Sequence, residues 1–224
     1  MTLLTRKVFG PLAATALFVT VAACSQGEGS DWASLFDLAK KSWGRSEHSV
    51  TLKQAGDVPF ASIGVRIGDQ GQRMMVLAAN NGADLLWTSS SKLALSTNNG
   101  RITRAIGFEN DLTGFMAETG NVFPDLPAVW AKPRQVAWTV DFAAQGLYSV
   151  EVSCTDLPAA NEVIQILGQD IRTLRVDESC DARQIDWHFV NHFWVDTDTG
   201  SVWRSVQYIN PNVDPIEIEV LRPF

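Results

Sequence analysis

Apolar and polar residues alternate over short stretches along most of the chain, and turn residues separate these stretches about every 8–12 positions. Alternation with a period of two is the pattern of a β-strand with one buried face. The pattern predicts strands over residues 58–67, 74–79, 85–88, 93–97, 101–108, 112–117, 135–142, 147–155, 162–167, 172–177, 185–196, 202–209 and 216–221. Such a series suits an antiparallel barrel or sandwich, and we predict an all-β antiparallel meander forming a barrel or half-barrel of about a dozen strands.

Residues 31–43 (DWASLFDLAKKSW) predict one short N-terminal helix. Apolar residues recur there at helical spacing, Ser30 or Asp31 can cap the first turn, and Gly44 follows the last. Residues 123–133 contain three prolines and are therefore predicted as a long connection rather than a strand.

The first 23 residues have the pattern of a lipoprotein signal peptide. Arg6 and Lys7 precede an apolar run over residues 8–23, which is shorter than the roughly 20 residues that span a bilayer comfortably. The run ends in Val-Ala-Ala-Cys, which resembles the lipobox of bacterial lipoproteins, so cleavage would leave Cys24 carrying lipid. Ser25 follows where Asp would favour inner-membrane retention, which predicts an outer-membrane protein. The alternative is an ordinary signal peptide with an incidental cysteine.

This interpretation divides the chain into a signal peptide (1–23), a lipidated flexible tether (24–30) and a single β-rich periplasmic domain (31–224). An oxidising compartment favours a disulfide between the two remaining cysteines, Cys154 and Cys180. Two buried thiols are the alternative.

Charge and composition exclude some classes of function. The formal net charge is −7, with 18 basic against 25 acidic residues and no basic cluster, which argues against binding nucleic acid through its phosphates. The 46% of hydrophobic residues excludes a disordered chain.

Two segments resemble each other at an offset of one hundred residues: 95–106 (LSTNNGRITRAI) and 195–206 (VDTDTGSVWRSV), and Trp87 and Trp187 share that offset. Gly100 and Gly200 are predicted to adopt positive φ in a hairpin turn followed by a bulge. A duplicated half-barrel and a coincidence between two glycine hairpins both explain the similarity.

The second hairpin predicts which residues face each other. Val195 is expected opposite Trp203 on the core face, and Trp194 opposite Arg204 on the other face, as a cross-strand cation–π pair. His188 and His192 share the face of Trp194.

No motif of catalytic or metal chemistry emerges. His188 and His192 are four residues apart, but on a strand their Cα atoms would be about 13 Å apart, too far to hold one ion easily. The sequence has neither a Gly-x-Ser-x-Gly nor a phosphate-binding Gly-x-x-x-x-Gly-Lys motif. Glu217 and Glu219 share a strand face and are interpreted as solvated. We therefore predict no catalytic residue, no metal and no cofactor.

Several short segments carry a resemblance to a known family: 59–63 (PFASI), 76–78 (VLA), 86–89 (LWTS), 97–102 (TNNGRI), 107–112, 194–196 (WVD), 199–205 (TGSVWRS), Gln207, Pro211 and 219–223 (EVLRP). In this order, and with the lipobox, they resemble the YjbF/GfcB family of lipoproteins, which are encoded with genes for export of group 4 capsule and exopolysaccharide. The resemblance covers residues 24–224.

The resemblance implies an outer-membrane lipoprotein that faces the periplasm and has an all-β, barrel-like fold. It also implies partners, namely an outer-membrane β-barrel protein and a periplasmic protein of a polysaccharide secretion system. The family offers no catalytic motif to carry over.

The leading hypothesis is a non-enzymatic accessory factor for assembly or export of an exopolysaccharide, held at the membrane by the lipid on Cys24. Flat aromatic side chains suit sugars, so Trp194, Trp203 and Trp130, together with Arg204, are candidate contacts for a glycan or a partner. One alternative is a lipid or lipoprotein carrier or chaperone with an apolar cavity of several hundred Å³. Another is a glycan hydrolase with two carboxylates about 5–10 Å apart in a cleft.

Overall fold

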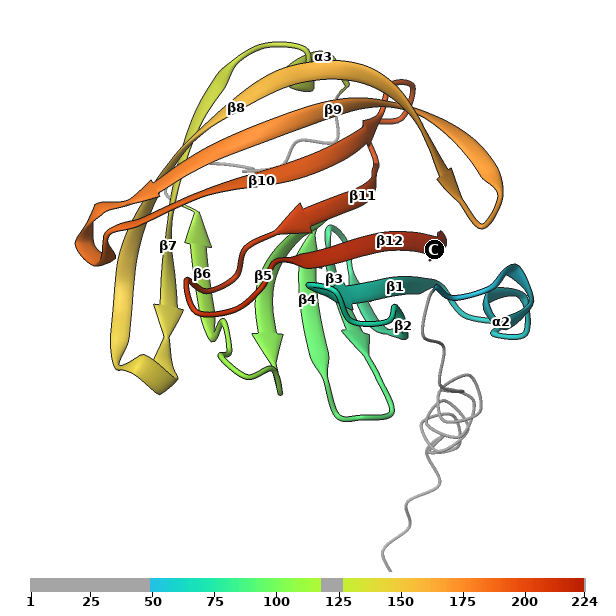
Figure 1. Ribbon diagram of the computed structural model, residues 1–224, viewed down its shortest axis with the longest axis horizontal. Coiled ribbons are helices and arrows are strands. Elements are labelled where there is room, and N and C mark those ends of the chain that lie inside the picture. Colours follow the sequence, from blue (N-terminus) through green and yellow to red (C-terminus); the bar gives the residue numbers. More distant parts are fainter. Residues whose placement is uncertain (1–48, 118–126, 224) are drawn as a thin grey trace, which may run out of the picture.

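The computed structural model describes residues 49–117 and 127–223. Within these ranges twelve strands form one antiparallel sheet, in the order β5-β4-β3-β2-β1-β12-β11-β10-β9-β8-β7-β6 (Figure 1). Consecutive strands pair with each other except β5 and β6, which are the two edges of the sheet, and β1 also pairs with β12. The strands are β1 (Ser62–Ile67), β2 (Arg73–Asn81), β3 (Asp84–Thr88), β4 (Ala94–Asn98), β5 (Arg101–Ile106), β6 (Gly114–Ala117), β7 (Arg134–Phe142), β8 (Leu147–Ile166), β9 (Gln169–Ala182), β10 (Trp187–Asp196), β11 (Val202–Gln207) and β12 (Ile216–Arg222).

The sheet curls into a nearly closed barrel. β1 and β12 lie side by side over most of their length, with Ile67 opposite Ile216 at one end (Figure 1). The two edge strands, β5 and β6, approach each other at a single bridge between Ala105 and Leu112. The prediction of an all-β antiparallel meander forming a barrel is therefore confirmed.

The described helices are short: α2 (Leu52–Gly56) and α3 (Pro127–Trp130), together with two 3₁₀ turns at Ala143–Gln145 and Arg183–Ile185. Thr51 caps α2 through a capping box with Gln54. None of the helices in the described ranges has the length and apolar character to cross a bilayer. The helix predicted over 31–43 lies outside the described residues.

One prediction about strand boundaries was wrong. Residues 147–155 and 162–167 were expected to be separate strands, but residues 147–166 form the single long strand β8. A bulge between Pro158 and Ala160 absorbs the proline, and pairing with β9 continues on both sides of it. Because β9 also extends to Ala182, Cys154 and Cys180 lie on directly paired strands.

Inward-facing residues of every strand contribute to one main core, in which Leu95, Ala105 and Phe193 have no exposed surface. A second, smaller cluster lies under α2 and includes Ala55 and Met74. Leu167, at the turn between β8 and β9, packs against this second cluster. The long β8–β9 hairpin therefore reaches the N-terminal helix of the described domain.

The hairpin glycines behave as predicted, with φ of 85° at Gly100 and 77° at Gly200. The predicted register is only half right: Trp194 lies opposite Arg204, but a bulge places Val195 opposite Val202 instead of Trp203. The two tryptophans at this offset are placed differently, because Trp87 lies on β3, the strand before its hairpin, whereas Trp187 lies on β10, the first strand of its hairpin.

Candidate functional site

A buried ion pair spans the barrel interior. Arg101, at the start of β5, and Glu178, on β9, are 4% and 0% exposed, and Nη2 of Arg101 donates to Oε1 of Glu178. The guanidinium group lies 4.1 Å from the ring centroid of Trp138 and 5.3 Å from that of Phe193. Both charges are thus removed from water, and two aromatic rings pack against the guanidinium group.

A wider network surrounds this pair. Asn191 donates to Oε2 of Glu178 at 2.7 Å and accepts from the backbone N–H of Tyr208 at 2.9 Å. Gln207 accepts from the backbone N–H of Ile102 at 3.0 Å and donates to the carbonyl of Gly100 at 2.8 Å. Polar side chains therefore connect β5, β9, β10 and β11 across the interior.

Burial dominates the electrostatics of Glu178. It raises the pKa of this carboxyl, and the negative charge of Asp156 raises it further, whereas Arg101 and the hydrogen bond from Asn191 act in the opposite direction. Asp156 is itself buried and forms an ion pair with Arg134 at 2.8 Å.

The interior beside the network is packed. The hollow lined by Arg101, Trp138 and Asn191 has a volume of about 20 Å³. That volume holds about one water molecule, against the several hundred Å³ of a ligand cavity. The interior at this level therefore has no room for a lipid chain.

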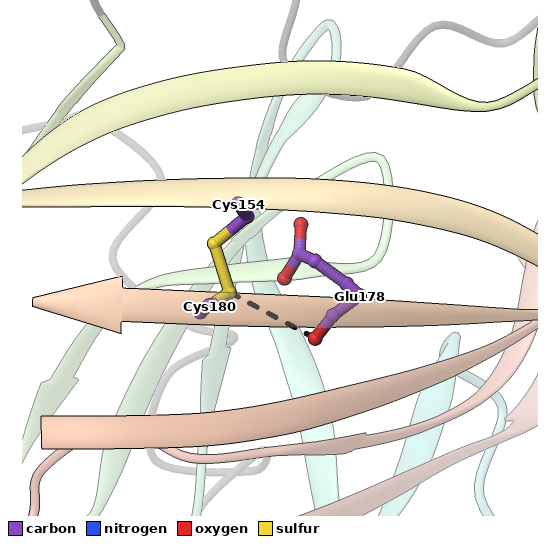
Figure 2. A group of neighbouring side chains, drawn as sticks. All are labelled: Cys154, Glu178 and Cys180. Carbon is purple, nitrogen blue, oxygen red and sulfur yellow. Dashed lines mark hydrogen bonds between the residues drawn. A yellow bond between two sulfur atoms is a disulfide. The ribbon is translucent and has the colours of Figure 1, made fainter.

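The two cysteines form a disulfide, as predicted, with Cα atoms 4.1 Å apart. Figure 2 shows it beside the carboxylate of Glu178, which lies two residues before Cys180 on β9. Donor atoms of these three residues lie within 4.8 Å of one another. Metals bind cysteine as the thiolate, and the disulfide occupies both sulfurs, so this trio does not fit a metal site.

The outer face of β10 and β11 carries the predicted aromatic–cation pair. The guanidinium carbon of Arg204 lies 5.7 Å from the ring centroid of Trp194. Trp194 also donates to Glu162 at 2.7 Å, and Arg204 forms an ion pair with Glu219. Both side chains are partly exposed, and contacts across neighbouring strands hold them in place.

The outer face also contains both histidines of the described domain. His192 lies 2.7 Å from a carboxylate oxygen of Asp177, and His188 lies 3.3 Å from one of Asp181. Each histidine therefore faces a different carboxylate.

Trp203 is partly exposed and donates to Asp196 at 3.2 Å. Partial burial disfavours the charge of Asp196, but hydrogen bonds from the backbone N–H groups of Thr199 and Asp198, and from Trp203, outweigh it and hold the pKa of Asp196 below its usual range.

The prediction of Trp130 as a surface contact was wrong. Trp130 is 3% exposed, and its ring packs against Phe193 in the core. Trp130 was a candidate because flat aromatic side chains suit sugars, but at the end of α3 its ring is buried in the barrel core. Cys24 lies outside the described residues, so its lipidation remains a prediction.

Sequence reasoning missed the buried ion pair. Glu178 lies between Val176 and Cys180 at alternating positions of one strand face, and all three are buried. A carboxylate on an apolar face was the signal available in the sequence. Its partner Arg101 could not be identified in the same way because 77 residues separate the two.

Two larger hollows lie on the surface of the part of the chain that the structure describes. A groove of about 670 Å³ crosses β7 to β10 near the disulfide, and its lining includes Ser153, Ser179 and His188. A pocket of about 590 Å³ opens at one end of the barrel, between the β1–β2 and β11–β12 turns; we call it the mouth pocket.

These features define a class: a nearly closed, all-antiparallel barrel whose packed interior is cross-linked by a disulfide and a polar network. The family model described as "Group 4 capsule polysaccharide lipoprotein gfcB, YjbF" matches residues 25–221, and the chain belongs to this family.

Two uncharacterized lipoproteins of Escherichia coli (strain K12) are similar to the chain. GfcB is 26% identical over 197 residues, covering 85% of this chain and 86% of its own. YjbF is 25% identical over 201 residues, covering 85% of each. The crystal structure of the hypothetical lipoprotein YmcC from E. coli (K12) shares the fold, with a TM-score of 0.62 and 24% identity over 78% of this chain and 90% of that one.

Proposed function

We propose that this protein is a lipid-anchored, non-enzymatic accessory factor that assists the assembly or export of a capsular or extracellular polysaccharide at the periplasmic face of the outer membrane. Its membership in a family of group 4 capsule polysaccharide lipoproteins supports the polysaccharide and the lipid anchor. The expected partners are an outer-membrane β-barrel protein and a periplasmic protein of the secretion system.

The packed interior is the observation that carries the choice of an accessory factor over a carrier. Beside the Arg101–Glu178 pair the hollow holds about one water molecule, and the rings of Trp138 and Phe193 lie against the guanidinium group. A carrier would need an apolar cavity many times larger. The protein is therefore expected to act through its surface and the hollows that open on it, and not through an internal cavity beside this pair.

Complementation of a deletion strain tests this function. Loss of exported polysaccharide on deletion, and its return with the wild-type gene, are the expected results. Unchanged export in the deletion strain would contradict the proposed role.

Two further variants test separately whether the protein needs a lipid anchor and whether it needs to be in the outer membrane. Cys24→Ala removes the lipidated residue, and we expect it not to restore export. Ser25→Asp keeps Cys24 but carries the residue that favours inner-membrane retention, so it should be lipidated and still fail to restore export. Full restoration by Cys24→Ala would show that the anchor is unnecessary, and full restoration by Ser25→Asp would show that the membrane is irrelevant.

A further inference from the structure

The mouth pocket lies at the end of the barrel where β1 and β11 end and β2 and β12 begin. Its volume of about 590 Å³ lies within the range of about 300–1,000 Å³ that is typical of ligand sites. Its floor is apolar and includes the buried side chains of Ile209 and Ile216. Two aromatic side chains, Phe108 and Tyr208, join the floor from different loops.

The rim of the pocket consists of polar side chains with unused hydrogen-bonding capacity. Within the described part of the chain, the side chains of Gln70, Arg73 and Asn212 form no hydrogen bond or ion pair. The arginines of the outer face differ, since Arg175 and Arg204 are both committed to carboxylates. The rim therefore presents an amide, a guanidinium group and a second amide to whatever fills the pocket.

The loops around the pocket are held in place. Gly68 donates its backbone N–H to the carbonyl of Pro215 at 3.1 Å, which ties the β1–β2 turn to the β11–β12 loop. A Cβ on Gly68 would lie 2.5 Å from the side chain of Asp214, and φ at Gly68 is +49°, so both the close approach and the backbone conformation favour glycine. Because the backbone of these loops is already held, a ligand need not order it on binding.

The buried network continues into the pocket. Asn191, which donates to Glu178, also accepts the backbone N–H of Tyr208. The ring of Tyr208 lies 6.1 Å from that of Phe189 in the core. The interior polar contacts thus fix the position of an aromatic residue that lines the pocket.

The geometry points to the mouth pocket as a binding site for a short, neutral segment of a polysaccharide. Aromatic faces suit the apolar faces of sugar rings, and amides with a guanidinium group suit their hydroxyls. Glu109 and Asp214 also line the pocket, so its acidic residues outnumber its one arginine and an anionic sugar is disfavoured. This inference rests on the proposed function and specifies the ligand class of that function.

The two tyrosines of the chain provide a direct test, because Tyr208 lines the pocket and Tyr148 lies on β8 outside its lining. The full mature protein would be labelled with 3-fluorotyrosine, which gives two ¹⁹F resonances, assigned with Tyr148→Phe. The probes are neutral and uronate-containing oligosaccharides from partial hydrolysis of the exopolysaccharide of the producing strain, separated by anion exchange. We expect neutral oligosaccharides to shift the Tyr208 resonance and leave that of Tyr148 unchanged.

Two variants measure the contacts by calorimetric titration. Tyr208→Ala should weaken binding about three- to tenfold, as expected for the loss of one aromatic contact, and Tyr148→Ala is its matched control. Arg73→Ala removes an exposed side chain that has no partner in the described residues, so it should weaken binding with no change in thermal unfolding.

Several outcomes would overturn the assignment: no shift with neutral oligosaccharides, equal shifts of both tyrosines, a response only to uronate-containing probes, or a response only to a tryptic digest of periplasmic proteins. Complementation separates this inference from the proposed function. If deletion abolishes export but Tyr208→Ala and Arg73→Ala restore it fully, the pocket assignment fails while the accessory role remains. If deletion leaves export unchanged, the accessory role fails, and the titration alone decides whether the pocket binds sugar.

Discussion

Arg101 on β5 and Glu178 on β9 form an ion pair in the barrel interior, at positions 4% and 0% exposed. Their strands lie on opposite sides of the gap between the two edge strands, β5 and β6. Each charge has lost its water, and the attraction between them offsets that loss only while both are present. The ring of Trp138 covers the guanidinium group, so water has little access to compensate for a missing partner. This arrangement makes the two residues strongly interdependent.

Removing one member of this pair should therefore destabilise the fold more than removing both. We expect Arg101→Met or Glu178→Leu alone to lower the free energy of unfolding by about 3–5 kcal/mol. The double variant should recover most of that loss, because no unpaired charge remains. Urea unfolding of the four proteins gives the coupling energy, and additive effects of the single substitutions would contradict this prediction.

The buried carboxyl also predicts a pH dependence of stability. Burial raises the pKa of Glu178 above its ordinary value of 4.5, so the folded chain holds this proton more tightly than the unfolded chain does. The resulting contribution to stability is complete at low pH and is lost as pH rises through the raised pKa.

Glu178→Gln does not titrate and serves as the reference. The free energy of unfolding of the wild-type protein minus that of the variant should fall as pH rises above 4.5, and should level off once Glu178 is ionised in both states. Denaturant unfolding at a series of pH values measures this difference. A difference that rises with pH in that window would show that the charge of Arg101 affects the pKa of Glu178 more than burial does.

Alternation of apolar residues was sufficient to predict the strand-built barrel and the inward face of β10, including the buried Phe193 and Val195. The register at its hairpin was harder. Gly200 indicated the turn, but the position of the bulge decides whether Val202 or Trp203 faces Val195, and sequence alone does not fix it.

The sequence could predict contacts in the candidate sites only between residues that are close together along the chain. Trp194 and Arg204 are ten residues apart on one hairpin, so a turn model places them together. The mouth pocket joins Arg73, the first residue of β2, with Phe108 and Tyr208, which come from the loops after β5 and β11. Their meeting depends on barrel closure between β1 and β12, and no pattern within any one segment encodes it.

The disulfide predicts a chemical and a thermodynamic result. Free-thiol labelling of the mature protein, denatured without reduction, should modify neither Cys154 nor Cys180. Replacing both with Ser should lower stability by roughly 3.5 kcal/mol, from the entropy of the loop that the bond closes. Two reactive thiols, or an unchanged unfolding midpoint in the double variant, would contradict the bond or its contribution.

Two glycines allow crowding to be separated from backbone strain. Gly100 and Gly82 both have positive φ, at 85° and 69°, but a Cβ on Gly100 would lie 2.5 Å from the side chain of Val202, whereas a Cβ on Gly82 would meet nothing within 4 Å.

Alanine at either position should lower the free energy of unfolding by about 1–2 kcal/mol, because a residue with a Cβ disfavours the left-handed conformation. Gly100→Ala should lower the free energy of unfolding by about 1–3 kcal/mol more, because Val202 lies on β11, packs against the core and has little room to move. Thermal unfolding of the two variants measures the difference, and Gly100→Ala combined with Val202→Ala should lose most of the excess. Equal destabilisation by the two single substitutions would mean that the β4–β5 turn does not press against β11, and the contacts that Gln207 makes with Gly100 and Ile102 would then have to be looser than the structure shows.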